Sequence, residues 1–284
     1  MVKPASFTYH RARDVAETLA LLAELGDEAK ILAGGQSLVA MMNFRLARPA
    51  ALIDITRIPG LNYLRAGPDG LRIGALTPHR AVETIRDPAV LDGFGVLQRS
   101  AHWIGHYPIR VRGTFGGSVA HADPASEWCL LAVLLEASIV LHGPDGQRIL
   151  PATEFFLGTY ETAADPGEMI TEIWFPRPAR QAVLTEFAQR QGDFAIVAAA
   201  VSLQVTDGVC DAARIVLGGV SSLPLLLDTS DLAGQPATPQ TWQEAGELAA
   251  AAIDPPSDGH ASGDYRKKLA ATLVSRALAE ANGL

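Results

Sequence analysis

Cysteine is scarce in this sequence: Cys129 and Cys210 are the two thiols among 284 residues. Two thiols are too few for a disulfide framework and for the four thiolates that an iron–sulfur cluster requires. Cys129 lies in an apolar run and is most simply a core thiol. Any iron–sulfur chemistry connected with this protein must therefore lie on another chain.

Long apolar runs and positive charge are also lacking. No stretch approaches the roughly 20 consecutive apolar residues that span a bilayer, and the N-terminus has no apolar core of a signal peptide. Lysine and arginine number 23 against 31 aspartates and glutamates, which gives a net charge of -8. Nucleic-acid binders usually carry a basic face. We therefore expect a cytoplasmic protein with no membrane span and no nucleic-acid partner, in which an anionic ligand is held by local groups.

Hydrophobic residues make up 48% of the chain, which is enough to form more than one core. Asp14 begins a capping-box pattern, and apolar residues at helical spacing follow as far as Gly26. Short apolar strands are expected at 29–33 and 52–55. Residues 1–57 are therefore predicted to form a small N-terminal subdomain.

Residues 58–177 show a mixture of strands and helices. The expected elements are strands at 71–75 and 168–175, helices at 96–103 and 124–136, and a hairpin that turns at Pro144-Asp145-Gly146. Pro176-Arg177-Pro178 looks like a boundary.

Residues 178–284 are predicted to form a C-terminal α+β domain. A second hairpin pairs 195–205 with 212–220 around an Asp207-Gly208 turn, and helices are expected at 241–252 and 261–281.

Two segments pair consecutive glycines with hydroxyl residues. They are Ala33 to Leu38 (AGGQSL) and Thr114 to Ser118 (TFGGS). Adjacent glycines let the backbone approach a ligand and turn its N–H groups inward, and the hydroxyls add donors, so a diphosphate would suit them. Each pair alone is explained equally well as a tight turn. Two such segments on one chain favour the anion site.

Several charged residues follow the second segment or precede it. Asp123 and Pro124 fit the N-cap and first position of a helix whose positive end faces a cofactor. His121, Asp123 and Glu127 lack the regular helical spacing of a metal site, and His102 and His106 look like a structural pair at a helix end. Arg110 and Arg112 either pair with phosphate or a partner subunit, or lie on a solvated strand edge.

Three stretches together resemble a known family, the FAD-binding medium subunits of molybdenum hydroxylases of the carbon monoxide dehydrogenase and xanthine dehydrogenase type. They are Leu32 to Leu38, Ile109 to Pro124 and Gly192 to Ala195 (GDFA). The resemblance covers nearly the whole chain. It implies an α+β chain with a two-subdomain FAD-binding fold of the vanillyl-alcohol oxidase/PCMH type, followed by a C-terminal α+β domain with a small antiparallel sheet.

The resemblance also implies which residues contact the cofactor, and it implies no catalytic side chain and no protein-bound metal. Phe194 matches an aromatic position beside the isoalloxazine that is often tyrosine, so a hydroxyl donor is missing here. Ile170 matches a position near the adenine or its ribose. The implied FAD contacts are Ala33, Gly34, Gly35, Gln36, Ser37, Leu38, Ile104, Thr114, Phe115, Gly116, Gly117, Ser118, Asp123, Glu127, Ile170 and Phe194.

The function implied by the resemblance is electron transfer within a heterotrimer. A molybdopterin large subunit hydroxylates a substrate, an iron–sulfur small subunit passes the electrons, and FAD on this chain gives them to an external acceptor. Two alternatives remain open: a self-contained FAD-dependent oxidase or dehydrogenase on the same fold, and a nucleotide-binding scaffold without redox turnover.

Overall fold

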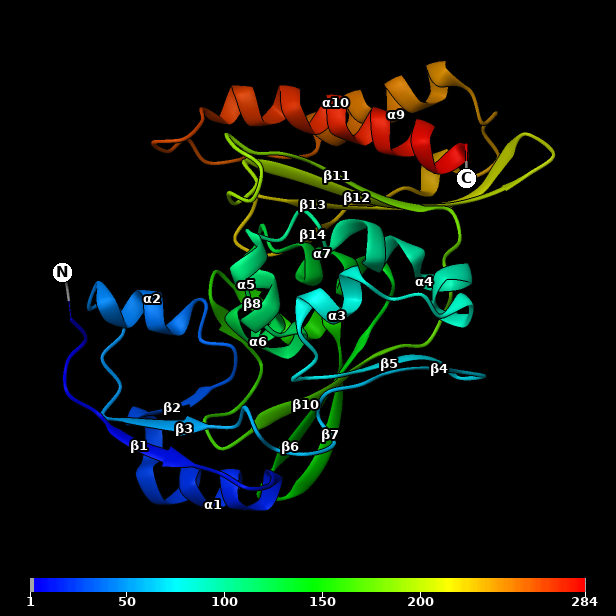
Figure 1. Ribbon diagram of the computed structural model, residues 1–284. Helices are drawn as coiled ribbons and strands as arrows, with labels where there is room; N and C mark the ends of the chain where they lie inside the picture. Colours follow the sequence, from blue (N-terminus) through cyan, green and yellow to red (C-terminus); the bar gives the residue numbers. More distant parts are fainter. Residues whose placement is uncertain (1–2, 284) are drawn as a thin grey trace.

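The protein is described by a computed structural model that covers residues 3–283. Its main sheets follow one another from one end of the molecule to the other in chain order (Figure 1). The N-terminal region lies at the lower left of Figure 1, the central region lies in the middle, and the C-terminal sheet with its two long helices forms the top. Within the described residues, no helix has both the length and the apolarity that crossing a membrane requires.

The N-terminal region is a parallel sheet in the order β1-β3-β2, with α1 packed against β3. The Asp14 side chain caps α1 by accepting a hydrogen bond from the Glu17 N–H at 2.8 Å, so the predicted helix start is confirmed. The elements of this region are β1 (Thr8–Arg11), α1 (Val15–Leu25), η1 (Gly26–Glu28), β2 (Ala29–Leu32), α2 (Leu38–Asn43) and β3 (Ala51–Asp54).

The central region is a five-stranded antiparallel sheet in the order β4-β5-β10-β6-β7. Gly146 supplies the positive φ of 106° in the predicted hairpin turn. The elements are β4 (Leu64–Gly67), β5 (Gly70–Gly74), α3 (His79–Glu83), α4 (Pro88–Ser100), α5 (Tyr107–Arg112), α6 (Phe115–His121), α7 (Glu127–Leu134), β6 (Ser138–Gly143), β7 (Gly146–Pro151), α8 (Ala152–Phe155), β8 (Phe156–Gly158), β9 (Glu161–Thr162) and β10 (Met169–Phe175).

The C-terminal region is an antiparallel sheet in the order β11-β12-β13-β14, covered on its outer side by α9 and α10 (Figure 1). Asp207 and Gly208 both have positive φ, as a two-residue hairpin turn requires. The elements are β11 (Ala182–Phe187), β12 (Val197–Thr206), β13 (Val209–Gly218), β14 (Leu225–Leu226), η2 (Ser230–Leu232), α9 (Pro239–Ala251) and α10 (Gly263–Asn282).

The C-terminal sheet is buried on both faces. Ala198 and Ala200 of β12 belong to the central core, whereas Val197 and Ala199 pack toward α9 and α10. A strand that is buried on both sides shows a continuous apolar run rather than an alternation, and the alanines leave room for α7. This arrangement joins the central and C-terminal regions along a broad apolar contact.

The predicted helix over 124–136 is wrong at its start. Asp123 does not cap a helix, because its side chain accepts a hydrogen bond from the Ala125 N–H at 2.9 Å and closes a turn. The helix α7 begins at Glu127, which is three residues after the predicted start at Pro124, and Ser126 is its N-cap residue. The prediction missed this because an Asx turn and an N-cap use the same side-chain contact.

The helix predicted over 96–103 begins at Pro88 and ends at Ser100, capped by Asp87. His102 and His106 therefore do not share a helix face, since His102 follows α4 and His106 precedes α5. The α+β fold class is confirmed. The domain limits at 1–57, 58–177 and 178–284 stay a prediction.

Candidate functional site

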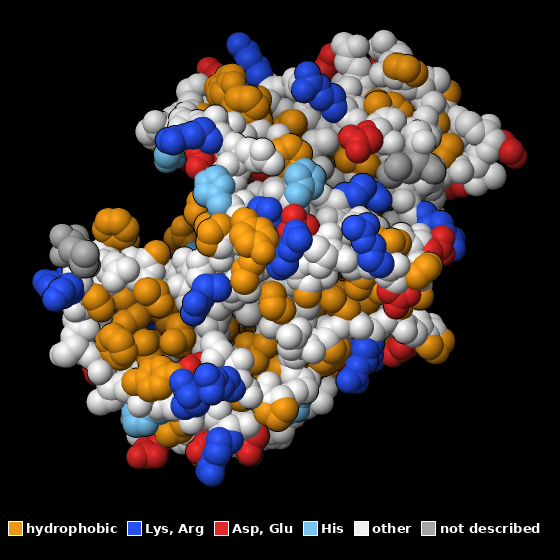
Figure 2. Space-filling view, viewed as in Figure 1, with side chains coloured by type: hydrophobic (Ala, Val, Ile, Leu, Met, Phe, Trp, Pro, Cys, Tyr) orange, Lys and Arg blue, Asp and Glu red, His pale blue; other side chains and the backbone are white. Residues whose placement is uncertain are grey.

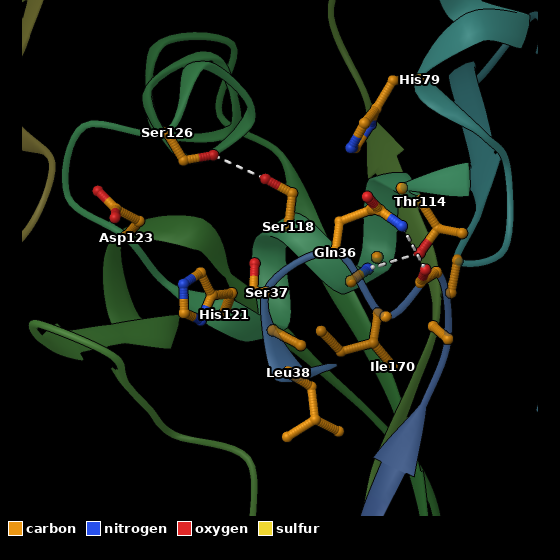
Figure 3. Close-up of a pocket in the computed structure, with 18 of the residues that line it drawn as sticks. Gln36, Ser37, Leu38, His79, Thr114, Ser118, His121, Asp123, Ser126 and Ile170 are labelled. Carbon is orange, nitrogen blue, oxygen red and sulfur yellow. Dashed lines mark hydrogen bonds between the residues drawn. The ribbon is translucent and has the colours of Figure 1, made fainter. Parts of the chain in front are cut away.

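A cavity of about 460 Å³ lies where the three regions meet, and it falls in the size range of cofactor sites. Its walls come from the loop after β2, from α5 and α6, and from β10, and the loop between β11 and β12 reaches its rim. The hollow between the two lobes on the left of Figure 2 leads to it. Figure 3 shows the side chains that line it.

The first glycine segment supplies unpaired backbone donors. Among residues 3–283, no backbone carbonyl accepts a hydrogen bond from the N–H groups of Gly35, Gln36, Ser37 or Leu38. Gly35 has a φ of +72°, which turns the chain between β2 and α2, and its carbonyl accepts the Val39 N–H at 3.1 Å. Consecutive free N–H groups beside a cavity suit an anion.

The second glycine segment is a helix rather than a loop. Thr114 is the N-cap of α6, and its Oγ1 accepts a hydrogen bond from the Gly117 N–H at 3.1 Å. The Gly116 N–H donates to the Ala75 carbonyl at 2.9 Å, so both glycine donors are already used. Neither glycine has a positive φ, and the tight-turn interpretation is wrong for this pair. The segment offers the cavity the hydroxyls of Thr114 and Ser118 instead.

The two glycine segments lie against each other. A Cβ on Gly34 would come within 2.2 Å of the Arg112 carbonyl oxygen and 2.7 Å of Gly113 Cα. A Cβ on Gly117 would come within 2.7 Å of Thr114 Oγ1 and 3.8 Å of Ala33 Cβ. Glycine at 34 is therefore required for the backbone of the N-terminal region to reach that of the central region.

The structure brings the predicted contact residues together, with one exception. Phe115 does not line the cavity, because its side chain is fully buried and stacks on Trp128 with ring centroids 4.5 Å apart. Phe194 is 71% exposed, and Ile104 and Ile170 are almost fully buried. The residues that line the cavity as predicted are Ala33, Gly34, Gly35, Gln36, Ser37, Leu38, Ile104, Thr114, Gly116, Gly117, Ser118, Asp123, Glu127, Ile170 and Phe194.

Arg110 does not lie on a strand edge, and its guanidinium pairs with groups of this chain. It lies on α5, and its Nε donates to Glu83 Oε2 at 2.9 Å while its Nη1 donates to the Gly105 carbonyl at 2.7 Å. Arg112 also lies on this helix, with its side chain exposed. Because both belong to a helix, the strand-edge alternative is wrong. The guanidinium of Arg110 links α5 to Glu83 of α3 and to the backbone of Gly105, which lines the cavity.

His79 is a cavity residue that no sequence motif singled out. Its Nδ1 accepts a hydrogen bond from Trp128 Nε1 at 2.9 Å, so the proton of the neutral ring must lie on Nε2. Burial, and to a lesser degree the nearby Arg110 charge, lowers the pKa of His79 to about 4. His79 is therefore neutral at physiological pH.

Ser126 and His121 also line the cavity. Ser126 Oγ lies 2.7 Å from Ser118 Oγ, and the two hydroxyls share a hydrogen bond (Figure 3). The His121 ring stacks on Tyr160, with centroids 4.7 Å apart, and burial lowers the pKa of His121 although Asp123 opposes the shift. With both imidazoles neutral, an anion in the cavity would meet backbone N–H groups, hydroxyls and the exposed Lys30.

Comparison with known proteins agrees with this geometry. Residues 5–178 match the family described as the FAD binding domain in molybdopterin dehydrogenase, and residues 182–281 match the CO dehydrogenase flavoprotein C-terminal domain. The 6-hydroxypseudooxynicotine dehydrogenase complex subunit alpha of Paenarthrobacter nicotinovorans is 38% identical, over 99% of this chain and 96% of that protein. The carbon monoxide dehydrogenase medium chain of Hydrogenophaga pseudoflava is 37% identical, over 97% and 96%.

A solved structure gives the same result. A chain of quinoline 2-oxidoreductase from Pseudomonas putida 86 superposes with a TM-score of 0.94 at 34% identity, covering 99% of both chains. Fold, cavity and comparisons together define a flavoprotein with an FAD-binding part and a C-terminal flavoprotein domain.

The chain belongs to the family of FAD-binding subunits of molybdopterin dehydrogenases. The resemblance inferred from the sequence is confirmed, and the cofactor is FAD.

Gly34→Ala tests the contact between the glycine segments. A Cβ that overlaps a backbone carbonyl must push the segments apart, at a cost of about 1–3 kcal/mol. We expect FAD affinity to fall at least about tenfold, measured by fluorescence titration. Gly259→Ala is the matched control, since a Cβ there meets nothing within 4 Å. Equal FAD affinity in Gly34→Ala and the wild type would contradict the proposed contact.

His79→Gln tests the neutral histidine. Unfolded histidine titrates near 6.5, so below that pH the unfolded chain takes up a proton that the folded chain does not. The free energy of unfolding of the apoprotein should fall as pH drops from about 6.5 to about 4, by up to about 3 kcal/mol from this residue. In the variant, the glutamine side chain keeps an acceptor for Trp128, and the fall in unfolding free energy with pH should disappear.

His260→Gln is the control, since His260 is exposed, and this variant should keep the same fall as the wild type. If the pH profiles of wild type and His79→Gln ran parallel, the neutral state of His79 would be refuted.

Proposed function

We propose that this chain holds FAD in the cavity between its three regions and transfers electrons from iron–sulfur clusters on a partner chain to an external acceptor. The observation that supports this most directly is the row of free N–H groups from Gly35 to Leu38, which faces the hydroxyls of Thr114 and Ser118 across one cavity. That arrangement is suited to a diphosphate that bridges the N-terminal and central regions.

We assign the remaining contacts by their chemistry. Ile104 and Ile170 offer apolar surface that excludes water from the rings of the cofactor, and Phe194 at the rim offers an aromatic face. Asp123 and Glu127 are placed to accept hydrogen bonds from cofactor hydroxyls. Phe115 is left out, because its buried ring supports Trp128 instead. The full set is therefore the predicted one without Phe115.

The bound FAD supplies two-electron redox chemistry, and the protein supplies position and electrostatics. The hydroxyls of Thr114 and Ser118 have fixed partners in Gly117 and Ser126, which hold them in place before the cofactor binds. His79 keeps its Nε2 proton across physiological pH and remains a donor in the cavity wall. Such preformed groups orient the cofactor without reorganisation.

The complex we propose is a heterotrimer with a molybdopterin large subunit and an iron–sulfur small subunit. The relatives are named as subunits of larger assemblies, namely a dehydrogenase complex subunit and a medium chain. The two cysteines of this chain are both buried and cannot ligate a cluster of their own. Buried free thiols also fit the reducing cytoplasm, where we propose that the complex works.

Purified chain should bind FAD in about one noncovalent equivalent, because hydrogen bonds rather than a covalent tether hold it. Acid precipitation should release all the flavin, measured by its absorbance in the supernatant. Flavin that stayed with the pellet would contradict noncovalent binding. A chain that folds but takes up no flavin would instead point to the scaffold without redox turnover.

The isolated chain should not oxidise aldehydes, purines or carbon monoxide, because the molybdenum and iron–sulfur sites lie on the proposed partners. Expressed with its partners, it should co-purify with molybdenum and iron, measured by metal analysis. Turnover of such a substrate by the metal-free chain would favour the self-contained oxidase. Purification from its native source without any metal-containing partner would argue against the heterotrimer.

A further inference from the structure

The loop between β11 and β12, residues 188–196, forms part of the rim of the FAD cavity and is called the rim loop below. Three of its residues line the cavity, namely Gly192, Asp193 and Phe194. The side chain of Phe194 is 71% exposed, so little packing within the protein holds its ring. The position of this ring therefore depends on how the backbone of the rim loop is held.

The rim loop is fixed at its tip and at its base. At the tip, Gly192 has a φ of 87°, and a Cβ there would come within 2.6 Å of His106 Nδ1. At the base, the Ile196 N–H donates to the Phe187 carbonyl at 2.8 Å. The carbonyl of Ile196 accepts a hydrogen bond from the side chain of Arg266, in the first turn of α10. The stretch between tip and base carries the exposed aromatic ring.

Arg266 is a buried arginine that joins three segments of the C-terminal region. Its residue surface is 5% exposed. Its Nη1 donates to the carbonyls of Ile196 and Gly219, the second at 2.8 Å, and its Nη2 donates to Asp258 Oδ2 at 2.6 Å. One planar guanidinium thus connects the rim loop with the turn after β13 and with the loop before α10.

The start of α10 supports the base of the rim loop by contact as well. Gly219 has a φ of 74°, and a Cβ there would lie 2.4 Å from the Ile196 carbonyl oxygen. The Tyr265 ring meets the Phe187 ring edge to face, with centroids 6.3 Å apart. In Figure 1, α10 begins on the left, at the same end of the C-terminal sheet as the rim loop. The base of the loop therefore has little room to shift while Arg266 is in place.

Stability alone explains a buried arginine poorly at this position. Burial of a guanidinium costs free energy even when it is paired, and Arg266 Nε has no hydrogen-bond partner among residues 3–283. Hydrogen bonds from the Ala261 and His260 N–H groups and from Arg266 lower the pKa of Asp258 to about 2, so the pair stays charged at physiological pH. The geometry that the guanidinium fixes accounts better for its presence.

We propose that Arg266 is a positioning residue for the cofactor site, which holds the Ile196 carbonyl and thereby fixes the rim loop with the Phe194 ring over the FAD cavity. The inference rests on the proposed function, in which Phe194 offers an aromatic face to the cofactor. Arg266 does not itself line the cavity, so it acts through the loop. Its loss should uncover the cofactor and leave the other cavity walls in place.

The first experiment measures how firmly the rim loop is held in the full-length apoprotein. The Arg190 side chain lies in this loop and is 84% exposed, so trypsin cuts after Arg190 whenever the backbone opens locally. We expect Arg266→Met to speed this cut at least about fivefold, measured by mass spectrometry. Arg266→Lys should recover part of the protection, because an ammonium still donates to a carbonyl but lacks the fork of a guanidinium.

Two controls separate a loosened loop from general unfolding. The cut after Arg57, which is exposed in the N-terminal region, should keep its wild-type rate in both variants. Arg214→Lys, at an arginine that holds the last carbonyls of α7, should leave both rates unchanged. If Arg266→Met does not fold, Arg266→Lys provides the test with a smaller increase over wild type. Unchanged cutting after Arg190, or an equal rise after Arg57, would overturn the proposal.

The second experiment measures the cover over the cofactor, as quenching of FAD fluorescence by iodide in the FAD-loaded chain. The quenching constant should rise at least about twofold in Arg266→Lys and in Phe194→Ala. The double variant should match Phe194→Ala, because a loop without the ring has nothing left to position, and coupled residues give non-additive effects. Additive increases, or no increase in either single variant, would contradict the proposal. A chain that bound no FAD would refute the proposed function, while the trypsin experiment would still decide whether Arg266 holds the loop.

Discussion

The approach of Gly34 to the backbone of Arg112 and Gly113 is the constraint on which the site depends. The two segments meet main chain to main chain, and no side chain larger than a hydrogen fits between them. This contact fixes the free N–H groups after β2 opposite the hydroxyls at the start of α6. If these segments separated, each would keep its local structure and the cavity would lose one wall.

The C-terminal region is seated by similar close contacts. A Cβ on Gly192 would collide with the His106 ring, and one on Gly218 would collide with Leu130, so the loop at the cavity rim and the sheet behind α7 both lie directly on the central region. Arg214 of β13 adds to this contact by donating hydrogen bonds to the last backbone carbonyls of α7. The orphan carbonyls of a helix end are thereby satisfied from the neighbouring region.

The site meets negative charge with backbone N–H groups and hydroxyls, together with the exposed Lys30 at the cavity edge. The guanidinium of Arg110 on α5 is paired with Glu83, and His79 is held neutral by burial. Burial raises the pKa of Glu127 to about 8, so the carboxyl of Glu127 adds little negative charge to the cavity near neutral pH. A cofactor with an anionic diphosphate thus meets a wall in which this carboxyl carries a proton.

The sequence by itself determined the features that depend on neighbours along the chain. The Asp14 cap, the hairpin turns and the apolar strands follow from local preferences, and the glycine segments carried the family resemblance. Sequence reasoning failed where one local contact serves two structures, as when Asp123 closed a turn instead of capping α7. Only the tertiary structure placed His79 in the cavity wall and removed Phe115 from it. No local pattern encodes such neighbours, because the packing of separate strands and helices sets which buried groups meet, and burial then sets their charge.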